Sequence, residues 1–374
     1  GLYYALLVIH GIINSLDSKT LARMTSGYVI VNLGITFVII ITLLATTPLH
    51  EMWGPSYTFG TIINQSGWEG QGGTAISFLF GLLSVQFVMT DYDATAHISE
   101  EVHRASIAAP VAIMVAVAGT GMVGWLLNIV LVITSGDVVH QNVDDMPGGL
   151  PMAQIMVNRM HKVGFLVVWP FVCLVAFFVV TTAMQANARS FYAFSRDHGL
   201  PDKGFFAKIY KRTGTTVNAV WLVVLCCIIL GLLGFISQYA INAIFALAAL
   251  GMDISYLIPI VCRQIFQDHP EVMFKPGPFT LGRGFFGRLI NGIAILWTIF
   301  ECTVLSIPQE MPIDEKNFNY SWVIMLGVLF LSLIWYVAHA HRHYHGPRST
   351  MSPEQLAKLD EGVKDEEKQP EASS

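Results

Sequence analysis

The chain has 374 residues, of which 13% are charged and 53% are hydrophobic, and its net charge is −5. Soluble proteins carry about 25% charged residues, so this composition excludes a disordered chain, a nucleic-acid-binding protein and an ordinary soluble enzyme. It is typical of a helical membrane protein that crosses the bilayer several times.

Nine apolar stretches approach the roughly 20 residues that a helix needs to cross a bilayer core of roughly 30 Å. They lie at 1–14, 28–47, 73–93, 109–134, 163–187, 217–235, 239–262, 286–307 and 321–340. Residues 346–374 are polar and lack aromatic side chains, which is typical of disorder. We therefore predict an all-α integral membrane protein with about nine transmembrane helices in residues 1–345 and a disordered cytosolic tail in residues 346–374.

The distribution of Lys and Arg predicts the orientation. Alternating loops divide these residues 18 to 3, and the richer set, which includes the C-terminal tail, belongs to the cytosolic side. Asn64 begins an Asn-Gln-Ser sequon in a loop assigned to the outside, where it could be glycosylated. Trp53 and Trp322 fall at predicted outer boundaries, where aromatic side chains gather.

The third predicted span contains acidic residues. Its apolar run, Ala75 to Met89, is short and leads into Asp91 and Asp93. Acids at membrane depth usually face a cavity or an ion path, and closely spaced Asp and Thr residues compete for backbone hydrogen bonds and weaken a helix. Transporters build substrate sites at such breaks. The alternative is that the helix ends at Met89 and both acids lie in cytosolic water, and position alone does not separate the two.

Three motifs of this chain occur together in one known family. Residues 80–101 contain Asp-Tyr-Asp-Ala-Thr-Ala-His-Ile-Ser-Glu-Glu, residues 187–201 run from Asn-Ala-Arg-Ser to Gly-Leu-Pro, and His10-Gly11 is followed by Asn14. In this order they resemble the sixth helix, the loop after the eighth helix and the fourth helix of fungal amino acid/choline/GABA permeases. These permeases belong to the amino acid–polyamine–organocation (APC) superfamily, and the resemblance extends to about His345.

The resemblance implies a LeuT-like bundle of twelve helices with an inverted repeat. This chain would then hold helices four to twelve and would be truncated at its N-terminus. The resemblance also implies roles for residues of the third span. Phe87, Thr90, Asp91, Tyr92 and Asp93 would bind substrate.

Coupling and gating roles follow from the same resemblance. Glu100 and Glu101 match paired acids at the cytoplasmic end, where they would serve in gating or, equally, in binding. Asp93, or else Asp91, would couple proton and substrate movement, because an acid near a dry cavity can take up and release a proton. An amine group on the substrate could instead pair with Asp91. Many relatives have Gly at the position of Asp91, so the resemblance does not define the backbone geometry there.

Thr181, Thr182 and Gln185 lie late in the fifth span. The resemblance places this helix beside the substrate site, and we include Thr182 among the candidate substrate-binding residues. Hydrogen bonding between helices is the more common use of polar side chains in membranes, so that interpretation is preferred for the group.

Asp253 lies inside the seventh span with Ser255 and Tyr256. An acid so far inside an apolar run is a candidate site residue, and we assign Asp253 to substrate binding. Glu301, near the outer end of the eighth span, could instead reach interfacial water.

No pattern in the sequence predicts a cofactor, a metal or an enzymatic site. Two Gly-rich patterns, at 119–124 and 282–287, lack the strand that a dinucleotide fingerprint requires. The alternating histidines at 339–345 do not share a helix face, and a histidine-box membrane enzyme would need further clusters. The five cysteines lie in or beside apolar runs, as free thiols do.

The sequence therefore predicts a secondary active transporter of amino acids or related small amines such as GABA, coupled to protons. Its partners would be the substrate, protons and the lipid bilayer, with no nucleic acid. Alternatives are a choline or polyamine permease and a truncated remnant without transport activity. We expect it in the plasma membrane, with the vacuolar membrane as the alternative, and with a cytosolic C-terminus.

Overall fold

The structure is a computed structural model. It describes residues 1–64, 66–70, 72–87, 91–99, 102, 104–141, 146, 149–236, 238–270, 272, 277–308, 311–314, 318–344 and 346. The helices are α1 (Leu2–Asn14), α2 (Ser18–Thr46), α3 (Pro55–Gly60), α4 (Gly73–Phe87), α5 (Ala94–His97), α6 (Ala105–Thr134), α7 (Pro151–Arg196), α8 (Val217–Ile236), α9 (Gln238–Phe266), α10 (Phe285–Ser306) and α11 (Ser321–Ala338). Short 3-10 turns lie at Leu49–Glu51, Gly136–His140 and Ala340–Arg342. The described residues form no β-strand beyond one isolated bridge between Tyr210 and Thr215.

The helices confirm the prediction of an all-α membrane protein, since each predicted span falls on a helix. Among the described residues, α2 and α6 to α11 are the seven helices long and apolar enough to cross a membrane. The other two predicted spans fall on α1 and α4, which are apolar but have 13 and 15 residues. At 1.5 Å per residue they reach about 20 Å and 23 Å, less than the bilayer core. The spanning helices leave most of their apolar surface outside the protein core, as a surface that faces lipid does.

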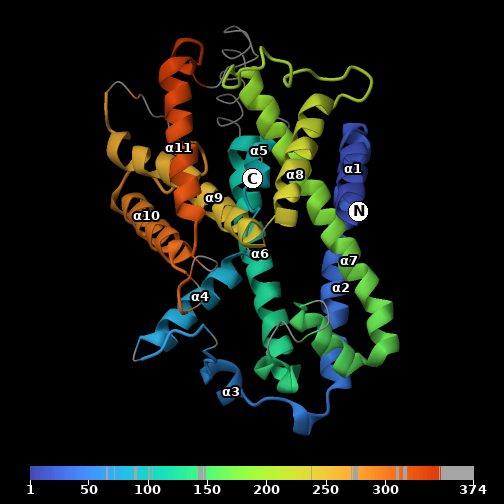
Figure 1. The fold of residues 1–374 in the computed structure, drawn as a ribbon. Helices are drawn as coiled ribbons and strands as arrows, with labels where there is room; N and C mark the ends of the chain where they lie inside the picture. The colour runs from blue at the N-terminus through green and yellow to red at the C-terminus, as the bar shows by residue number, and fades with distance from the viewer. Residues whose placement is uncertain are drawn as a thin grey trace, which may run out of the picture.

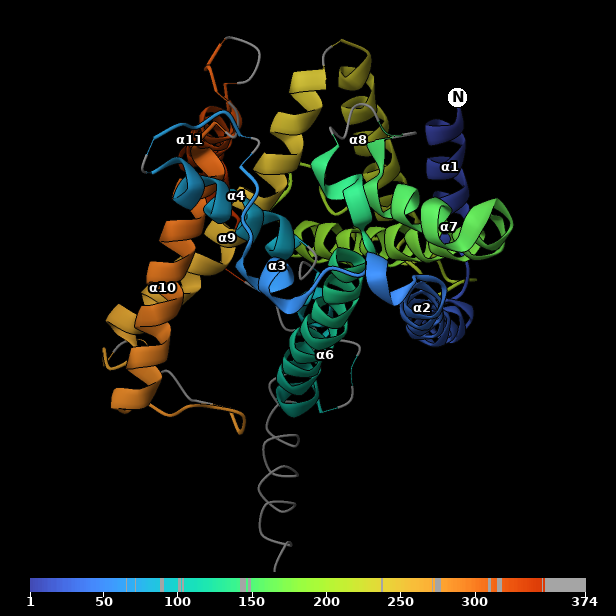
Figure 2. The ribbon, with the colours of Figure 1, turned by 90° about the horizontal axis from the view of Figure 1, so that it is seen from below.

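Two groups of helices lie on either side of α5 and α6 (Figures 1 and 2). The first group is α1, α2, α7 and α8, and the second group is α4, α9, α10 and α11; within each group neighbouring helices contact one another. Two apolar cores hold the first group together, one between α2, α6 and α7 and one between α1, α7 and α8. Direct contact between α8 and α9 joins the two groups.

Helix α7 is bent, which the sequence did not predict. His161 has a φ of 56° and interrupts the helix, so the predicted span at 163–187 follows the bend. Before the bend, Arg159 donates from Nε to the carbonyl oxygen of Thr134 at 2.7 Å and pairs with Glu51. The guanidinium thus satisfies a carbonyl that the end of α6 leaves open.

The connections gather at two opposite ends of the bundle (Figure 1). The loop at 197–216 and the end of α11 lie at one end, and the connections at 47–54 and 135–141 lie at the other. This arrangement agrees with the predicted alternation of spans. The predicted tail, apart from Gly346, lies outside the described residues.

Candidate functional site

The chain changes direction between α4 and α5, where the sequence predicts a break. Helix α4 ends at Phe87, residues 91–93 form a turn, and α5 begins at Ala94. Asp91 has a φ of 63°, in the left-handed region that Asp tolerates better than most residues. The two acids differ in environment, because Asp91 is exposed whereas Asp93 is buried, with 8% of its surface accessible. Asp93 therefore does not lie in open water, as the alternative required.

Two side chains hold the Asp93 carboxylate. The Tyr256 hydroxyl on α9 donates to Asp93 Oδ2 at 2.5 Å, and His97 Nε2 on α5 lies 3.1 Å from the same oxygen. Hydrogen bonds donated to a carboxylate favour its charged form, and bonds to a charged acceptor are stronger than neutral ones. Asp93 thus connects the broken segment to the second group of helices.

The other ring nitrogen of His97 extends this connection to α7. His97 Nδ1 lies 2.9 Å from Ser190 Oγ, and the same Oγ lies 3.2 Å from the carbonyl oxygen of Ala186. Ser190 has one hydroxyl hydrogen, which it can donate either to Nδ1 or to the carbonyl. All contacts are satisfied together when His97 carries a proton on each nitrogen, donating to Asp93 and to Ser190. We call Tyr256, Asp93, His97 and Ser190 the relay, because they link α9 to α7 through α5.

Further buried acids lie beside the relay. Asp253 and Glu301 have 8% and 5% of their surface accessible, and both lie close enough to Tyr92 to act on its hydroxyl electrostatically. The rings of Tyr92 and Tyr256 have centroids 6.4 Å apart. We call Tyr92, Asp93, Asp253, Tyr256 and Glu301 the tyrosine–acid cluster.

One oxygen of this cluster lacks a hydrogen-bond partner. Asp253 Oδ2 is buried and has no donor among the described residues. A buried carboxylate oxygen is costly unless a proton or a donor from a ligand satisfies it. The cluster is therefore suited to an ammonium group or to a proton.

Not all of the predicted site residues enter the cluster. The structure brings Tyr92, Asp93 and Asp253 together, with Asp91 adjacent in the chain. Thr182 donates its hydroxyl to carbonyls of its own helix, those of Phe178 and Val179. The remaining predicted residues lie outside what the structure describes: the Phe87 side chain, Thr90, Glu100 and Glu101.

The interpretation of Thr181 as a residue that bonds between helices is confirmed. His10 Nδ1 lies 3.0 Å from Thr181 Oγ1, and Asn14 Nδ2 donates to the Thr181 carbonyl oxygen at 3.2 Å. Both partners come from α1. These bonds fix α1 to α7 within the first group.

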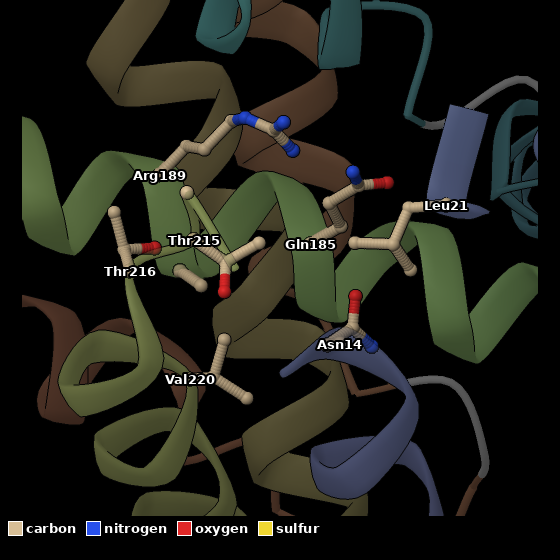
Figure 3. A pocket seen from close by; sticks show the side chains of 9 residues that line it. Asn14, Leu21, Gln185, Arg189, Thr215, Thr216 and Val220 are labelled. Carbon is tan, nitrogen blue, oxygen red and sulfur yellow. The ribbon is translucent and has the colours of Figure 1, made fainter. Parts of the chain in front are cut away.

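A shallow polar pocket lies next to these bonds (Figure 3). It is lined by Asn14, Leu21, Gln185, Ala188, Arg189, Gly214, Thr215, Thr216 and Val220. Asn14 is 2% exposed and its Oδ1 has no donor among the described residues. The pocket contains none of the predicted substrate-binding residues, and a bound water molecule is enough to satisfy the amide oxygen.

Asn64 is exposed and belongs to the connection between α3 and α4. This connection lies toward the end of the bundle opposite to the loop at 197–216 (Figure 1). Its Oδ1 accepts from the Ser66 hydroxyl at 2.7 Å, and its Nδ2 donates to the Trp68 carbonyl oxygen at 2.8 Å. Glycosylation at this residue stays a prediction.

Sequence reasoning missed three members of this site. His97 follows Asp93 by four residues, a spacing that places side chains together on a helix, and this signal was available. Glu301 was expected at the interface, but it is buried. Ser190 gave no signal, because nothing local to it indicates that a helix 93 residues earlier in the chain lies beside it.

Comparison with known proteins agrees with this architecture. Residues 1–330 match the family model described as amino acid permease. An uncharacterised amino-acid permease of Schizosaccharomyces pombe is 41% identical over 354 residues, which are 95% of this chain and 64% of the relative. Amino-acid permease 2 of Neurospora crassa is 32% identical, with 93% of this chain and 62% of the relative covered. Amino-acid permease BAT1 of Arabidopsis thaliana is 30% identical, with 94% and 67% covered. The chain thus spans between 62% and 67% of the length of these relatives.

Proposed function

Because this chain belongs to the amino acid permease family, we propose that it is a secondary active transporter of amino acids or related small amines such as GABA, coupled to protons. The family and the membrane-spanning helices are established above. The substrate, the coupling ion and the residues that act on them are the proposal.

The observation that supports it most is the buried Asp93 at the break between α4 and α5. Its carboxylate accepts from Tyr256 of the second group, and His97 carries the connection on to Ser190 of the first. Transporters of this general design expose their site alternately by moving one set of helices against another. Bonds that cross between two sets of helices are suited to control such a movement.

Proton coupling follows from the charge of Asp93. A protonated Asp93 has lost the negative charge that attracts His97 and strengthens the Tyr256 hydrogen bond. Proton uptake would therefore loosen the relay, and proton release would restore it. Asp91, exposed and next to Asp93, is the second candidate for this role.

Substrate recognition involves the tyrosine–acid cluster. Asp253 Oδ2 would accept from the substrate's ammonium group, and the turn at Thr90, Asp91 and Tyr92 would supply backbone groups. Phe87 would cover the substrate, and Thr182, Glu100 and Glu101 keep the binding and gating roles that the resemblance implies.

The unpartnered oxygen of Asp253 also bears on the alternative substrates. Polyamines carry charged N–H donors that could satisfy it, whereas choline has no hydrogen on its charged nitrogen and could offer only its neutral hydroxyl, which is the weaker donor. Of the two alternatives, a polyamine is thus favoured over choline.

Uptake by vesicles that contain the reconstituted chain tests the substrate class. The probes are a labelled neutral amino acid, GABA, a polyamine and choline. Loss of a hydrogen bond to a charged group costs about 1.5–3 kcal/mol, so Asp253→Asn should raise the KM of the transported amine by tenfold or more. The matched control is Asp137→Asn, an exposed acid outside the cluster. An unchanged KM would remove Asp253 from substrate binding.

The remaining alternative is a remnant without transport activity. Residues 1–374 and a form extended at the N-terminus are reconstituted in parallel, and their substrate uptake is compared. Uptake by the extended form alone would show that residues 1–374 are related to a transporter but do not transport by themselves. A fluorescent fusion observed in cells would distinguish the plasma membrane, which we propose, from the vacuolar membrane.

A further inference from the structure

The loop between α7 and α8 carries the densest positive charge in the described part of the chain. Lys203, Lys208, Lys211 and Arg212 lie within ten residues, and residues 203–216 contain no acid. All four cationic side chains are exposed, and none has an ion-pair partner among the described residues. Together, four exposed cations of one sign create a positive potential that attracts an anionic partner.

The same loop exposes large apolar side chains. Phe205, Ile209 and Tyr210 have 50%, 53% and 57% of their surface accessible. They alternate with the cations along the chain, and Lys208 Nζ lies 5.4 Å from the centre of the Phe205 ring. Aromatic and aliphatic side chains beside Lys and Arg are the combination that binds a membrane interface.

The loop is held in a defined shape, so its charges are presented together. Asp202 accepts from the Ser195 hydroxyl at 2.5 Å and from the Phe206 amide at 2.9 Å. The Tyr210 amide donates to the Thr215 carbonyl oxygen at 2.9 Å. Phe206 packs against the apolar core between α1, α7 and α8. Because binding then requires little ordering of the loop, less free energy is lost on association.

The position of the loop brings it to a bilayer surface. It connects α7 and α8, both of which are long and apolar enough to span a membrane, and it lies at one end of the bundle (Figure 1). We propose that residues 203–212 form a binding surface for the headgroups of anionic phospholipids, in which the four cations contact phosphate and carboxylate groups and Phe205, Ile209 and Tyr210 enter the interface.

A second possible occupant is the C-terminal segment of the same chain. Residues 347–374 contain seven acidic and four basic residues, and α11 approaches this loop, since Trp335 Nε1 donates to the Gly199 carbonyl oxygen at 3.4 Å. The segment has no aromatic side chain and only four large aliphatic ones, Met351, Leu356, Leu359 and Val363. It matches the charges of the loop but not its apolar side chains, whereas an anionic bilayer matches both.

Lipid retention by the purified full chain tests the proposal. The chain is equilibrated in detergent with equal amounts of phosphatidylserine and phosphatidylcholine, and the bound lipids are counted by native mass spectrometry. Each cation near an anionic surface contributes about fivefold to binding, so Lys208→Gln/Lys211→Gln/Arg212→Gln should lower the preference for phosphatidylserine by at least about tenfold. The control is Lys19→Gln/Arg23→Gln/Arg342→Gln, which removes the same amount of charge from other exposed residues. It should change the preference for phosphatidylserine much less.

The outcomes separate the possible occupants. Equal losses in the two triple variants would overturn the proposal, because the general charge of this end and not the loop would then attract lipid. An effect of the loop variant that emerges only after deletion of residues 347–374 would also overturn it, because the tail would then occupy the loop in the full chain. The thermal midpoint of each variant in detergent should match that of the parent, since the substituted cations have no ion-pair partner among the described residues.

Discussion

At the scale of single residues, the account depends on one carboxylate and its two donors. Asp93 is buried, and Tyr256 and His97 both bond to its Oδ2. Buried acids in membrane proteins are costly and usually have a function. Each donor can be removed separately, which makes the arrangement testable.

Tyr256→Phe removes one of the donors while it keeps the ring. A hydrogen bond to a charged group contributes about 1.5–3 kcal/mol, so we expect the rate of substrate uptake to fall by tenfold or more with little loss of folded protein. Tyr57→Phe is the control, because it removes a Tyr–His hydrogen bond of 3.0 Å at the far end of the bundle. Equal uptake by the two variants would show that the Tyr256 hydroxyl has no role in transport.

Asp202 predicts a pH dependence of stability outside the membrane. Partial burial opposes its ionisation, but hydrogen bonds from the Phe206 amide, the Ser195 hydroxyl and the Gly204 amide outweigh burial and hold the pKa of Asp202 below its ordinary value. A depressed pKa stabilises the fold above the unfolded pKa of about 3.9 and loses this effect as the pH falls through the folded pKa. Asp202→Asn should therefore cost about 1 kcal/mol at pH 7, and the difference in thermal midpoint should be smaller at pH 3 than at pH 7. A difference that is the same at both pH values would contradict this reasoning.

At the scale of elements, the break between α4 and α5 is the central feature. Its turn requires a φ of 63° at Asp91. The left-handed conformation costs about 1–2 kcal/mol for ordinary residues and nothing for Gly. Gly at position 91 would adopt this backbone conformation without that cost.

Three substitutions at Asp91 separate backbone geometry from charge. We expect Asp91→Gly to keep the free energy of unfolding of the parent and Asp91→Asn to lower it slightly. Asp91→Val should lower it by about 1–2 kcal/mol, because β-branched residues avoid positive φ. Size-exclusion profiles and thermal midpoints measure this order. Equal stability of the Val and Gly variants would show that the turn does not need this conformation.

Local patterns predicted the elements but not their partners. The spans followed from the length of each apolar run, and the break followed from acids close together at 91–93. The bond between Tyr256 and Asp93 joins residues 163 positions apart, and no pattern within either segment specifies it. The bend at His161 was missed for a related reason, since a His residue gives no local sign that its φ will be positive.

At the scale of the whole molecule, the orientation is the first prediction. If the loop at 197–216 faces the cytosol, Asn64 faces the opposite side, where glycosylation occurs. Asn64→Gln should therefore remove a glycan from the protein expressed in a eukaryotic cell. Lys211→Asn creates an Asn-Arg-Thr sequon in the loop and should add none. A glycan on that new sequon would show that the orientation is the opposite of the predicted one.

The two groups of helices give the relay its importance. Tyr256 belongs to the second group, Ser190 belongs to the first, and Asp93 and His97 lie between them. A change of charge at Asp93 therefore acts where the groups meet. This junction is where movement of one group against the other would be controlled.

Uptake driven by a pH gradient tests this claim most directly. Vesicles that contain the parent chain or Asp93→Asn are compared with and without an imposed gradient. The substitution keeps the size of the side chain and removes its charge and its capacity to exchange a proton. We expect the gradient to increase accumulation by the parent and to have no effect on Asp93→Asn. Accumulation by the variant that still follows the gradient as it does in the parent would contradict the account.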